Sequence, residues 1–440
     1  MKGEKLKMNL KGKRLLILGG TGYFCKAIEY AKSQGVYTIV TDYFINSPAK
    51  KIADKSYNIS TTDIKNLQRV IEEEKIDGIF VGWSDINHYI AEKLCRKYKF
   101  PFYATKEQLY NFTNKKAFKA LCHKCNVPVV PEYDTKKLND LAYLESINFP
   151  VIVKPVDSYG GKGITICDNI ENLKLCIENA LQYSKTGEYI IEKYMDDKQY
   201  DTIGVYYSIQ DGKIALSSMT DRYMYEFDGV HRLNAAIFYP SQYLDRYLQT
   251  TDNLVKNMIK NSNIKNGTMF FEGCVNASGF YFWESGFRLC GAQQNIFPNY
   301  FNNVDVQNLL INFALTGKMD NKNLMYLEDP FFKGKFACNG LIFLKKGKIS
   351  TILGIEEIAA MQNVINFTQL KQVGDIISEE MIGTLNQSFA RFHIVADSKP
   401  KLYLLIRNVF NKLRVTDEND NNLIIYNYDF SIIDKEKIWK

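Results

Sequence analysis

The chain of 440 residues has no apolar run that approaches the roughly 18 residues needed to span a membrane. Its first residues, Met1 to Arg14, are basic but lack the apolar core of a secretory signal peptide. The cysteines number nine, without the regular spacing of a disulfide framework, which favours free thiols in a reducing compartment. We therefore expect a cytoplasmic protein without a membrane partner.

The sequence also lacks internal repeats and low-complexity segments. Apolar residues make up 46% and charged residues 24%, which is ordinary for folded domains, and the length predicts about three of them. The net charge of +7 is compatible with nucleic-acid binding, but the lysines are dispersed and often alternate with acidic residues, as at 72–75. We expect this charge to serve small anionic ligands and the solvated surface, and expect no nucleic-acid partner.

Apolar runs alternate with helical patterns in the first part of the chain. Leu15–Leu18, Thr38–Val40 and Gly78–Val81 have the composition of buried strands, and a helical pattern follows each of them. This order predicts a doubly wound parallel sheet, that is, a Rossmann-like domain over residues 14–110, behind a loosely attached basic tail over residues 1–13.

A glycine turn, Gly19 to Gly22, follows the first predicted strand, and Asp42 lies about 20 residues further along. In the dinucleotide-binding fingerprint, three glycines and such an acidic residue hold NAD. Gly20 and Gly22 fit the first two positions, but Cys25 occupies the third. A tight strand-to-helix turn is the favoured interpretation, and an NAD site is the alternative.

Cys122 and Cys125 enclose His123 with the C-x-x-C spacing of zinc ligands. A zinc site needs about four ligands, and no second pair lies nearby in the sequence. We therefore favour packed helical thiols over a metal site.

Residues 149–163 combine an apolar strand, a lysine and a flexible loop. Val151–Val153 leads to Lys154, and Pro155 follows. The loop consists of Ser158, Tyr159, Gly160, Gly161, Lys162 and Gly163. Because glycines tolerate positive φ, backbone N–H groups can close over phosphate oxygens while lysines neutralise their charge. We predict a phosphate-binding site; a hairpin turn with an unrelated lysine is the alternative.

Two carboxylates lie on adjacent predicted strands, Glu272 on 267–275 and Glu284 at the end of 279–284. Such a pair can share a hard cation such as Mg²⁺, whose preferred ligands are oxygens. Two solvated strand residues are the alternative. Arg288 follows, with a planar fork of donors that suits a carboxylate or a phosphate.

The last part of the chain is predicted to form an α/β subdomain over residues 311–440. In it, Gly340–Leu344 and Lys348–Ile352 are expected to form a hairpin, and Ser378–Ile394 a helix, whole or split.

In order and spacing, these motifs resemble those of ATP-grasp enzymes, with the layout of biotin carboxylase, carbamoyl phosphate synthase and the amino-acid ligases. The resemblance covers about residues 14–310 well. It implies a fold of α/β and α+β character in which a two-lobed ATP clamp, over residues 111–310, follows the parallel-sheet domain. The small lobe would span residues 111–200 and the large lobe residues 201–310.

The resemblance also implies an ATP site. Asn114–Lys119 resembles the motif of the first ATP lysine, the glycine loop resembles the lid over the triphosphate, and residues 192–195 resemble the hinge that meets adenine. Gln199 occupies a position that is often a ribose-binding glutamate. The implied ATP-binding residues are Lys115, Lys154, Ser158, Tyr159, Gly160, Gly161, Lys162, Gly163, Glu192, Lys193, Tyr194, Met195 and Gln199.

Glu272 and Glu284 match the metal ligands of the family, which implies Mg²⁺, with Mn²⁺ as an alternative. Arg288 matches the arginine that ends the family's Glu-x-Asn-x-Arg signature. The chain departs from that signature at Gly286, which replaces the asparagine and removes a ligand of a second metal ion.

The implied activity is an ADP-forming ligation in which a carboxylate is activated as an acyl phosphate and then captured by an amine. Lys154 and Arg288 would be catalytic. The implied substrate-binding residues are Arg222, His231, Arg232 and Arg288, although His231 and Arg232 fit a packed polar loop equally well. The substrates would be a small carboxylate and an amine, such as an amino acid, a dipeptide or an amino-sugar-like metabolite.

Residues 354–357 resemble the subdomain of amino-acid ligases that closes the substrate side, and the chain has no biotinyl motif, which disfavours a biotin carboxylase. An ATP-binding protein that has lost ligase activity is the alternative from another class. A homodimer is an open expectation.

Overall fold

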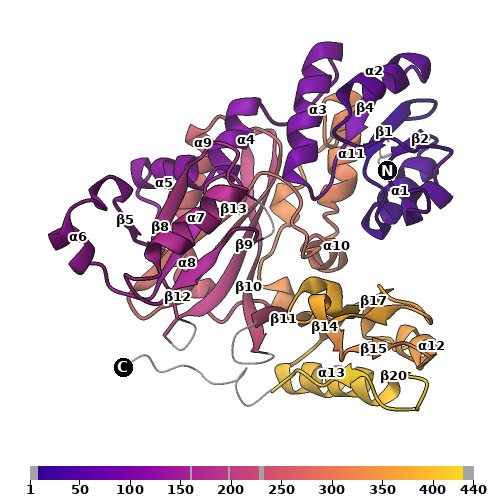
Figure 1. Cartoon of the computed structure of the whole chain (residues 1–440). Helices are drawn as coiled ribbons and strands as arrows, with labels where there is room; N and C mark the ends of the chain where they lie inside the picture. Colours follow the sequence, from indigo (N-terminus) through magenta and orange to yellow (C-terminus); the bar gives the residue numbers. More distant parts are fainter. Residues whose placement is uncertain (1–7, 159–160, 197–198, 227–231, 430–440) are drawn as a thin grey trace.

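The structure is a computed structural model that describes residues 8–158, 161–196, 199–226 and 232–429. Tyr159, Gly160 and His231, three predicted site residues, lie outside this part of the chain, and of Arg232 only the backbone is described. Three main sheets organise the fold: a parallel sheet near the N-terminus, a small antiparallel sheet and a large sheet that extends to the C-terminal part (Figure 1). The predicted combination of α/β and α+β architecture is confirmed.

The N-terminal sheet is parallel, as predicted, with strand order β3-β2-β1-β4. Apolar strands form its centre because helices cover both faces, so that both sides of each strand are buried. Its strands are β1 (Arg14–Leu18), β2 (Tyr37–Thr41), β3 (Lys55–Tyr57) and β4 (Gly78–Phe80), and its helices are α1 (Cys25–Ser33), α2 (Ile64–Glu73) and α3 (Asp85–Tyr98).

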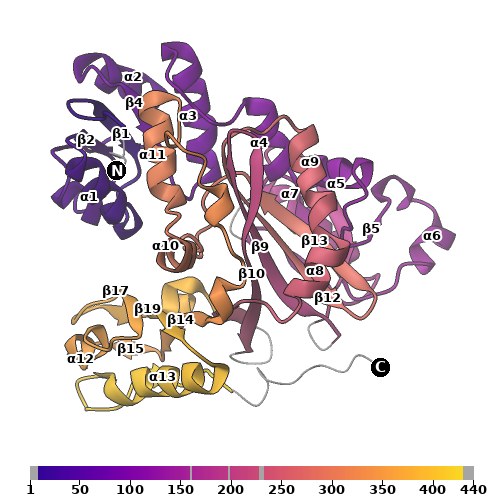
Figure 2. The same ribbon diagram turned by 180° about the vertical axis from the view of Figure 1, so that it is seen from behind.

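A helix from much later in the chain completes this domain. α11 (Val306–Thr316) lies beside β4, as both views in Figures 1 and 2 show, and buries its apolar residues together with those of α1. Leu10, which the sequence placed in a loose tail, is 2% exposed and packs in the same core, with Met8 partly buried against it. The boundary predicted between residues 310 and 311 falls inside α11; the domain limits stay a prediction.

The small lobe is an antiparallel sheet with the order β5-β8-β6-β7. Its strands are β5 (Glu132–Tyr133), β6 (Val151–Pro155), β7 (Thr165–Cys167) and β8 (Tyr189–Lys193), and its helices are α6 (Leu141–Glu145) and α7 (Leu173–Tyr183). The helices α4 (Lys106–Thr113) and α5 (Lys115–Lys124) connect this lobe to the N-terminal domain, and their buried residues, Phe112 and Phe118 among them, pack in the core of the large sheet against Phe271.

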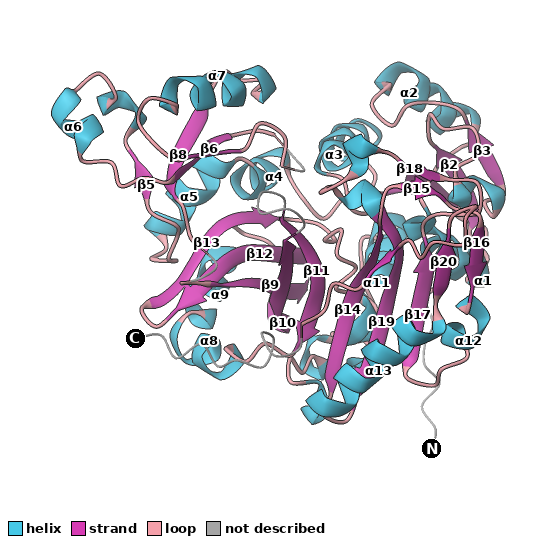
Figure 3. Cartoon of the chain, turned by 60° about the horizontal axis from the view of Figure 1, so that its bottom comes forward, coloured by secondary structure: helices cyan, strands magenta, loops and turns pink. Residues whose placement is uncertain are grey.

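The large sheet has nine strands in the order β13-β12-β9-β10-β11-β14-β19-β17, with β21 paired to β14 (Figure 3). Because β11 pairs with β14, the C-terminal strands continue the sheet of the large lobe. The strands are β9 (Asp201–Gln210), β10 (Lys213–Glu226), β11 (Arg232–Tyr239), β12 (Gly267–Asn276), β13 (Gly279–Gly286), β14 (Phe336–Leu344), β17 (Val364–Gln369), β19 (Ser388–Ala396) and β21 (Ile424–Ile425). The helices that complete this part are α8 (Leu244–Thr250), α9 (Asp252–Asn261), α10 (Ile296–Asn302), α12 (Ile355–Ala359) and α13 (Lys399–Lys412).

Two predictions for the C-terminal part are wrong. The segment predicted as a helix over Ser378–Ile394 contains short 3-10 turns and then β19, a strand whose residues are all buried. A strand buried on both faces lacks the alternation that would identify it. The predicted hairpin is also absent, because β14 pairs with β11 and β19, whereas β15 (Gly347–Lys348) pairs with β18 (Ile376–Ile377) and β16 (Thr351–Leu353) with β20 (Arg414–Thr416).

Among the described helices, none is both long and apolar enough to cross a membrane.

The late helix α11 should stabilise the N-terminal sheet. Leu310 on α11 is 2% exposed, so Leu310→Ala should lower the free energy of unfolding by about 2–5 kcal/mol through lost burial and a residual cavity. Leu404→Ala, on the exposed side of α13 at 56% exposure, is the matched control and should change it by less than about 0.5 kcal/mol. Urea unfolding of the full chain measures both, and equal effects would contradict the packing described for α11.

Candidate functional site

Two buried lysines face the junction of the small lobe and the large sheet. Asn114 caps α5 through its side chain, which accepts the Ala117 N–H and fixes Lys115 as the first helical residue. The Lys115 Nζ donates to the Ser158 carbonyl at 3.0 Å. Burial lowers the pKa of Lys115, the Glu284 carboxylate opposes this shift and the Lys154 ammonium adds to it. The two lysines and Glu284 are therefore within electrostatic reach of one another.

The Glu192 carboxylate is buried between two ammonium groups. Lys154 Nζ lies 2.6 Å from one oxygen, and Lys119, which is 1% exposed, pairs with the other. Burial by itself would raise the pKa of Glu192, but the charges of Lys154 and Lys119 outweigh it and hold the pKa below its ordinary value. Sequence reasoning missed Lys119; its position one helical turn after Lys115 on α5 was the available signal.

A cavity of about 130 Å³ opens beside this cluster, between the small lobe and β13. Its lining residues are Val130, Ile152, Lys154, Glu192, Lys193, Met195 and Trp283. Three of the predicted hinge residues, Glu192, Lys193 and Met195, thus share a cavity with the second lysine, Lys154. Apolar walls with charged groups at one end are suited to a flat, polar heterocycle. The predicted Gln199 is exposed, and its N–H donates to the Asp196 carbonyl.

The described part of the glycine loop has the backbone conformation that the sequence predicts. Gly161 and Gly163 have φ values of +78° and +75°. A Cβ atom on Gly163 would lie 2.8 Å from the Cβ of Tyr183, so only glycine fits there without a shift. Ser158 Oγ donates to the Lys162 carbonyl at 2.8 Å and closes the loop on itself.

The two predicted metal ligands lie directly opposite each other, since Glu272 on β12 is in register with Glu284 on β13. Burial raises the pKa of Glu284, the Glu272 charge adds to the rise, and Lys115, Lys154 and Arg288 act against it. Within the described residues, the Glu284 carboxylate has neither a hydrogen bond nor an ion pair. A half-buried, unpaired carboxylate beside another is suited to a hard cation.

Glu272 differs from Glu284 because it already has a cationic partner. Arg222 donates from Nη1 and Nη2 to the two carboxylate oxygens at 2.9 Å and 2.5 Å. Arg222 was expected to bind substrate, whereas here its fork holds Glu272 in place. A metal ion at this position would share the Glu272 carboxylate with Arg222. The Glu284 carboxylate has no competing partner among the described residues.

The glycine that replaces the expected asparagine has a packing reason. Gly286 lies opposite Phe270 in the β12–β13 pair. A Cβ atom on Gly286 would lie 2.3 Å from Cε1 of the Phe270 ring. The ring therefore fills the space that a side chain ligand would need, and the Arg288 guanidinium stacks over it at 4.9 Å. This arrangement suits one metal ion rather than two.

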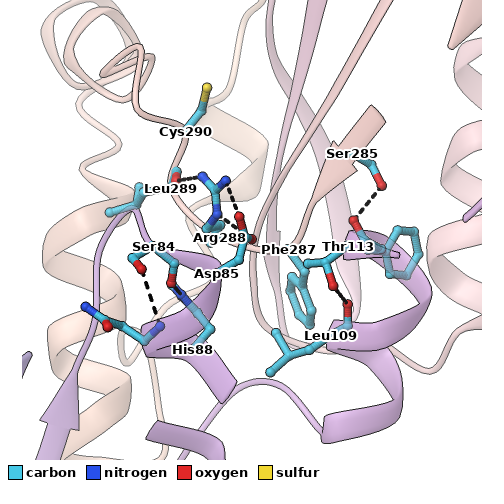
Figure 4. A network of polar contacts seen from close by, with 12 residues as sticks. Ser84, Asp85, His88, Leu109, Thr113, Ser285, Phe287, Arg288, Leu289 and Cys290 are labelled. Atoms are coloured by element: carbon cyan, nitrogen blue, oxygen red, sulfur yellow. Dashed lines mark hydrogen bonds and ion pairs between the residues drawn. The ribbon is translucent and has the colours of Figure 1, made fainter. Parts of the chain in front are cut away.

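Arg288 is held by an aspartate from the N-terminal domain (Figure 4). Nε and Nη2 each donate to a carboxylate oxygen of Asp85 at 2.6 Å, and Nη1 donates to the Leu289 carbonyl at 2.9 Å. Next to this pair, the fully buried His88 contacts the Ser84 carbonyl and the Tyr103 hydroxyl, and burial lowers its pKa to about 4. Arg288, expected to grip a substrate, therefore joins two domains as well.

A second group of buried polar side chains, which sequence reasoning missed, extends from Glu272 across the large sheet. Arg222 Nη2 contacts the Tyr206 hydroxyl at 3.4 Å, and Tyr206 packs with Cys290. On the same sheet, Arg391 on β19 donates to Asn339 Oδ1 at 3.0 Å. Burial raises the pKa of Tyr239, and the charges of Arg222 and Arg391 oppose the rise, so both guanidinium groups lie near this phenol.

Several atoms of this group have no hydrogen-bond partner among the described residues. They are Arg222 Nε, Tyr239 Oη, Arg391 Nε and His393 Nε2. Buried polar atoms are nearly always paired, so an unpaired group of this size indicates bound water or a polar ligand. We call Arg222, Tyr239, Asn339 and Arg391 the polar cluster. No spacing motif marks it, because its members come from four strands.

At the glycine turn after β1, the acidic residue of the dinucleotide fingerprint is engaged by the backbone of its own domain. The Asp42 carboxylate accepts the N–H groups of Gly20 and Phe44 at 2.7 Å and 2.8 Å, so both of its oxygens are used. A Cβ atom on Gly20 would lie 2.5 Å from the Cβ of Ser47, which explains this glycine by close packing.

The Cys-x-x-Cys pair lies on and just after α5. In the described residues, no three His, Cys, Asp or Glu side chains gather to hold a metal, and Cys122 is buried in α5.

Comparisons with known proteins agree with this geometry. Residues 114–289 match the family model of the carbamoyl-phosphate synthase L chain, ATP binding domain. The carbamoyl phosphate synthase large chain of Sulfolobus acidocaldarius is 29% identical over 181 residues, which are 39% of this chain and only 17% of that relative.

Solved structures match over nearly the whole chain. The L-amino acid ligase of Bacillus licheniformis has a TM-score of 0.73 at 16% identity and covers 93% of this chain and 100% of its own. The biotin carboxylase domain dimer of the Hydrogenobacter thermophilus 2-oxoglutarate carboxylase, in complex with MgADP, has a TM-score of 0.74 at 17% identity. The match covers 92% of this chain and 90% of that chain. The family match at residues 114–289 and the shared architecture show that this chain has the ATP-grasp fold.

Proposed function

We propose that this protein is an ADP-forming ligase that activates a small carboxylate with Mg-ATP and joins it to an amine. The observation that carries the proposal is the convergence of Lys115, Lys154 and Arg288 on the unpaired Glu284. Phosphoryl transfer requires neutralised and aligned phosphate oxygens more than it requires an acid–base pair, and this arrangement supplies both.

The ATP site would lie between the small lobe and β13. The cavity beside Lys193 and Met195 would hold adenine, and Lys115 and Lys154 would neutralise the phosphates. The glycine loop would cover them and exclude water, which matters because an acyl phosphate hydrolyses.

The residues fit one Mg²⁺ ion, which Glu284 and Glu272 would hold through oxygen ligands. When bound, the ion would supply charge neutralisation at the phosphates. Phe270 occupies the place of a further ligand, which supports a single-ion site.

The carboxylate substrate would bind at the polar cluster, whose unpaired donors include Arg391 Nε and the Tyr239 hydroxyl. The carboxylate oxygen attacks the γ-phosphorus, and the bond from that phosphorus to ADP breaks. The amine nitrogen then attacks the acyl carbon, the bond to phosphate breaks and the amine loses a proton. Arg391 would orient the carboxylate while Arg288 faces the acyl phosphate. A homodimer stays a prediction.

The second candidate is an ATP-binding protein without ligase activity. Two ion pairs favour it, because they engage residues that a ligase would use. Arg222 pairs with Glu272, and Asp85 pairs with Arg288. A screen of phosphate release over carboxylates combined with amines separates the two functions. ADP formation that depends on both partners supports the ligase, whereas Mg-ATP binding without turnover across the panel supports the second candidate.

Two adjacent lysines give a matched test of the ATP site. Lys115→Met removes a buried cation that the site uses, and ADP formation should fall by about 10²–10³-fold, as for loss of one charge-stabilising donor. Lys116→Met removes an exposed lysine that pairs with Glu188 and should leave turnover unchanged. Turnover is measured by phosphate release with the pair of substrates found in the screen. Equal turnover in the two variants would refute the placement of ATP.

Glu284 gives a test that needs no substrate. Its pKa is raised in the folded state, so its ionisation destabilises the metal-free protein at pH values above that pKa. Glu284→Gln should therefore raise the melting temperature of the metal-free protein at pH 8, and the gain should vanish below the unfolded carboxyl pKa of about 4.3.

The same variant should lose the thermal protection that Mg-ATP gives the natural protein. Glu188→Gln, at an exposed carboxylate, is the control and should change neither quantity. A less stable Glu284→Gln protein at pH 8 with intact Mg-ATP protection would contradict the site.

Arg391 tests the carboxylate site. Arg391→Ala should raise KM for the carboxylate roughly 10–100-fold, the value of a charge-assisted hydrogen bond, and leave KM for ATP unchanged. Arg69→Ala, on the exposed side of α2, is the control. Steady-state kinetics with each substrate varied in turn makes the measurement, and a parallel rise in both KM values would place Arg391 in a structural role instead.

A further inference from the structure

A large cavity lies away from the ATP site, at the carboxyl edge of the parallel sheet. Its volume is about 1090 Å³, and the loops after all four strands contribute to it. Its lining residues are Gly19, Thr21, Tyr23, Phe24, Asp42, Tyr43, Phe44, Ile45, Asn46, Ser47, Pro48, Ser60, Thr61, Thr62, Trp83, Ser84, Ile86 and Asn87. We call it the edge pocket.

The position of the edge pocket is one where α/β proteins bind ligands. The strand order β3-β2-β1-β4 reverses between β1 and β4. The helices that follow these two strands pack on opposite faces, α1 in one core and α3 in the other. The loops after β1 and β4 therefore diverge, and a crevice forms between them.

The charge of the lining is unfavourable for a phosphate-bearing ligand. None of the described lining residues is a lysine, an arginine or a histidine. The one carboxylate, Asp42, is used by the N–H groups of Gly20 and Phe44. Lys50, from the same loop, directs its ammonium to the carbonyls of Asp42 and Phe44. A phosphate or diphosphate would find no cation here, and its desolvation would not be compensated.

Aromatic side chains supply the recognition surface instead. The Trp83 indole lies edge-on to the rings of Tyr23 and Phe24, with centroids 5.4 Å and 5.0 Å away. Its Nε1–H is buried and has no partner in the described residues. Tyr43 and Phe44 lie 4.0 Å apart and are 63% and 60% exposed, which is unusual for rings of this size. Such walls suit a flat, uncharged body with one hydrogen-bond acceptor.

The edge pocket and the proposed ligation site include residues that are adjacent in the sequence. Ser84 lines the pocket, and the next residue, Asp85, holds Arg288 through two hydrogen bonds (Figure 4). The polar cluster, by contrast, extends from Glu272 on the large sheet. The edge pocket therefore belongs to the N-terminal domain, and the polar cluster belongs to the large sheet.

We propose that the edge pocket binds the uncharged aromatic body of the amine substrate, whose nitrogen points toward Arg288. This inference rests on the proposed function, because it assigns the second substrate of that reaction. It specifies the acceptor as an amine that carries a flat, apolar group and no phosphate.

Direct binding to the full chain tests the proposal without turnover. Isothermal titration with 2-phenylethylamine should show binding, and phosphoethanolamine, an amine with a phosphate in place of the ring, should not bind. The double variant Tyr43→Ala/Phe44→Ala should weaken binding of the aromatic amine about tenfold, the value of a ring contact. Tyr326→Ala, which removes a ring 74% exposed elsewhere, is the matched control and should bind as the natural protein does.

Binding of phosphoethanolamine in preference to the aromatic amine, no binding of the aromatic amine, or equal weakening by Tyr326→Ala would overturn the proposal. The phosphate-release screen separates this failure from failure of the proposed function. If the aromatic amine binds at the edge pocket but no pair of substrates yields ADP, the binding site stands and the ligase function fails. If ADP forms only with aliphatic or phosphorylated amines, and the double variant leaves their KM unchanged, the ligase stands and the pocket assignment fails.

Discussion

The ion pair between Asp85 and Arg288 connects the parts of this molecule on which a reaction would depend. The two residues are 203 positions apart, one at the start of α3 and the other just after β13. Both are largely buried, and the guanidinium fork meets the carboxylate with two hydrogen bonds of 2.6 Å. Loss of either partner would leave an uncompensated buried charge, so the geometry of this junction is strongly constrained. It places the N-terminal sheet against the end of the strand that carries Glu284.

The charged groups around this junction differ in whether they are compensated. Glu192 has two ammonium partners, Glu272 has one guanidinium, and Glu284 has no partner in the described residues. The compensated carboxylates fix the positions of Lys119, Lys154 and Arg222. The charge of the Glu284 carboxylate is unfavourable in the absence of a ligand, because no neighbouring cation pairs with it in the described residues. Such an uncompensated charge is typical of sites that bind a cation and phosphates.

Two regions of opposite chemistry adjoin the proposed ATP site. The polar cluster on the large sheet has buried donors without partners, whereas the edge pocket of the N-terminal domain has aromatic walls and no cation among its described lining residues. This asymmetry corresponds to the two partners of a ligation, since a carboxylate requires donors and an amine with an apolar body does not. Both regions adjoin elements that the Asp85–Arg288 pair holds together.

Local features could be predicted from the sequence: the apolar strands of the parallel sheet, the glycine loop with Lys154, and the placement of Glu272 and Glu284 on adjacent strands. These follow from composition and short spacing, which act within one or two elements. The sequence did not reveal Lys119 and Arg391 as site residues, Asp85 as the partner of Arg288, or the strand character of β19. Each of these depends on contacts between distant segments: β19 is buried on both faces, Arg391 reaches Asn339 across a strand pair, and Phe270 fills the space beside Gly286. These features depend on tertiary structure because the fold as a whole sets which groups are buried. Buried polar groups then require partners, which distant segments supply.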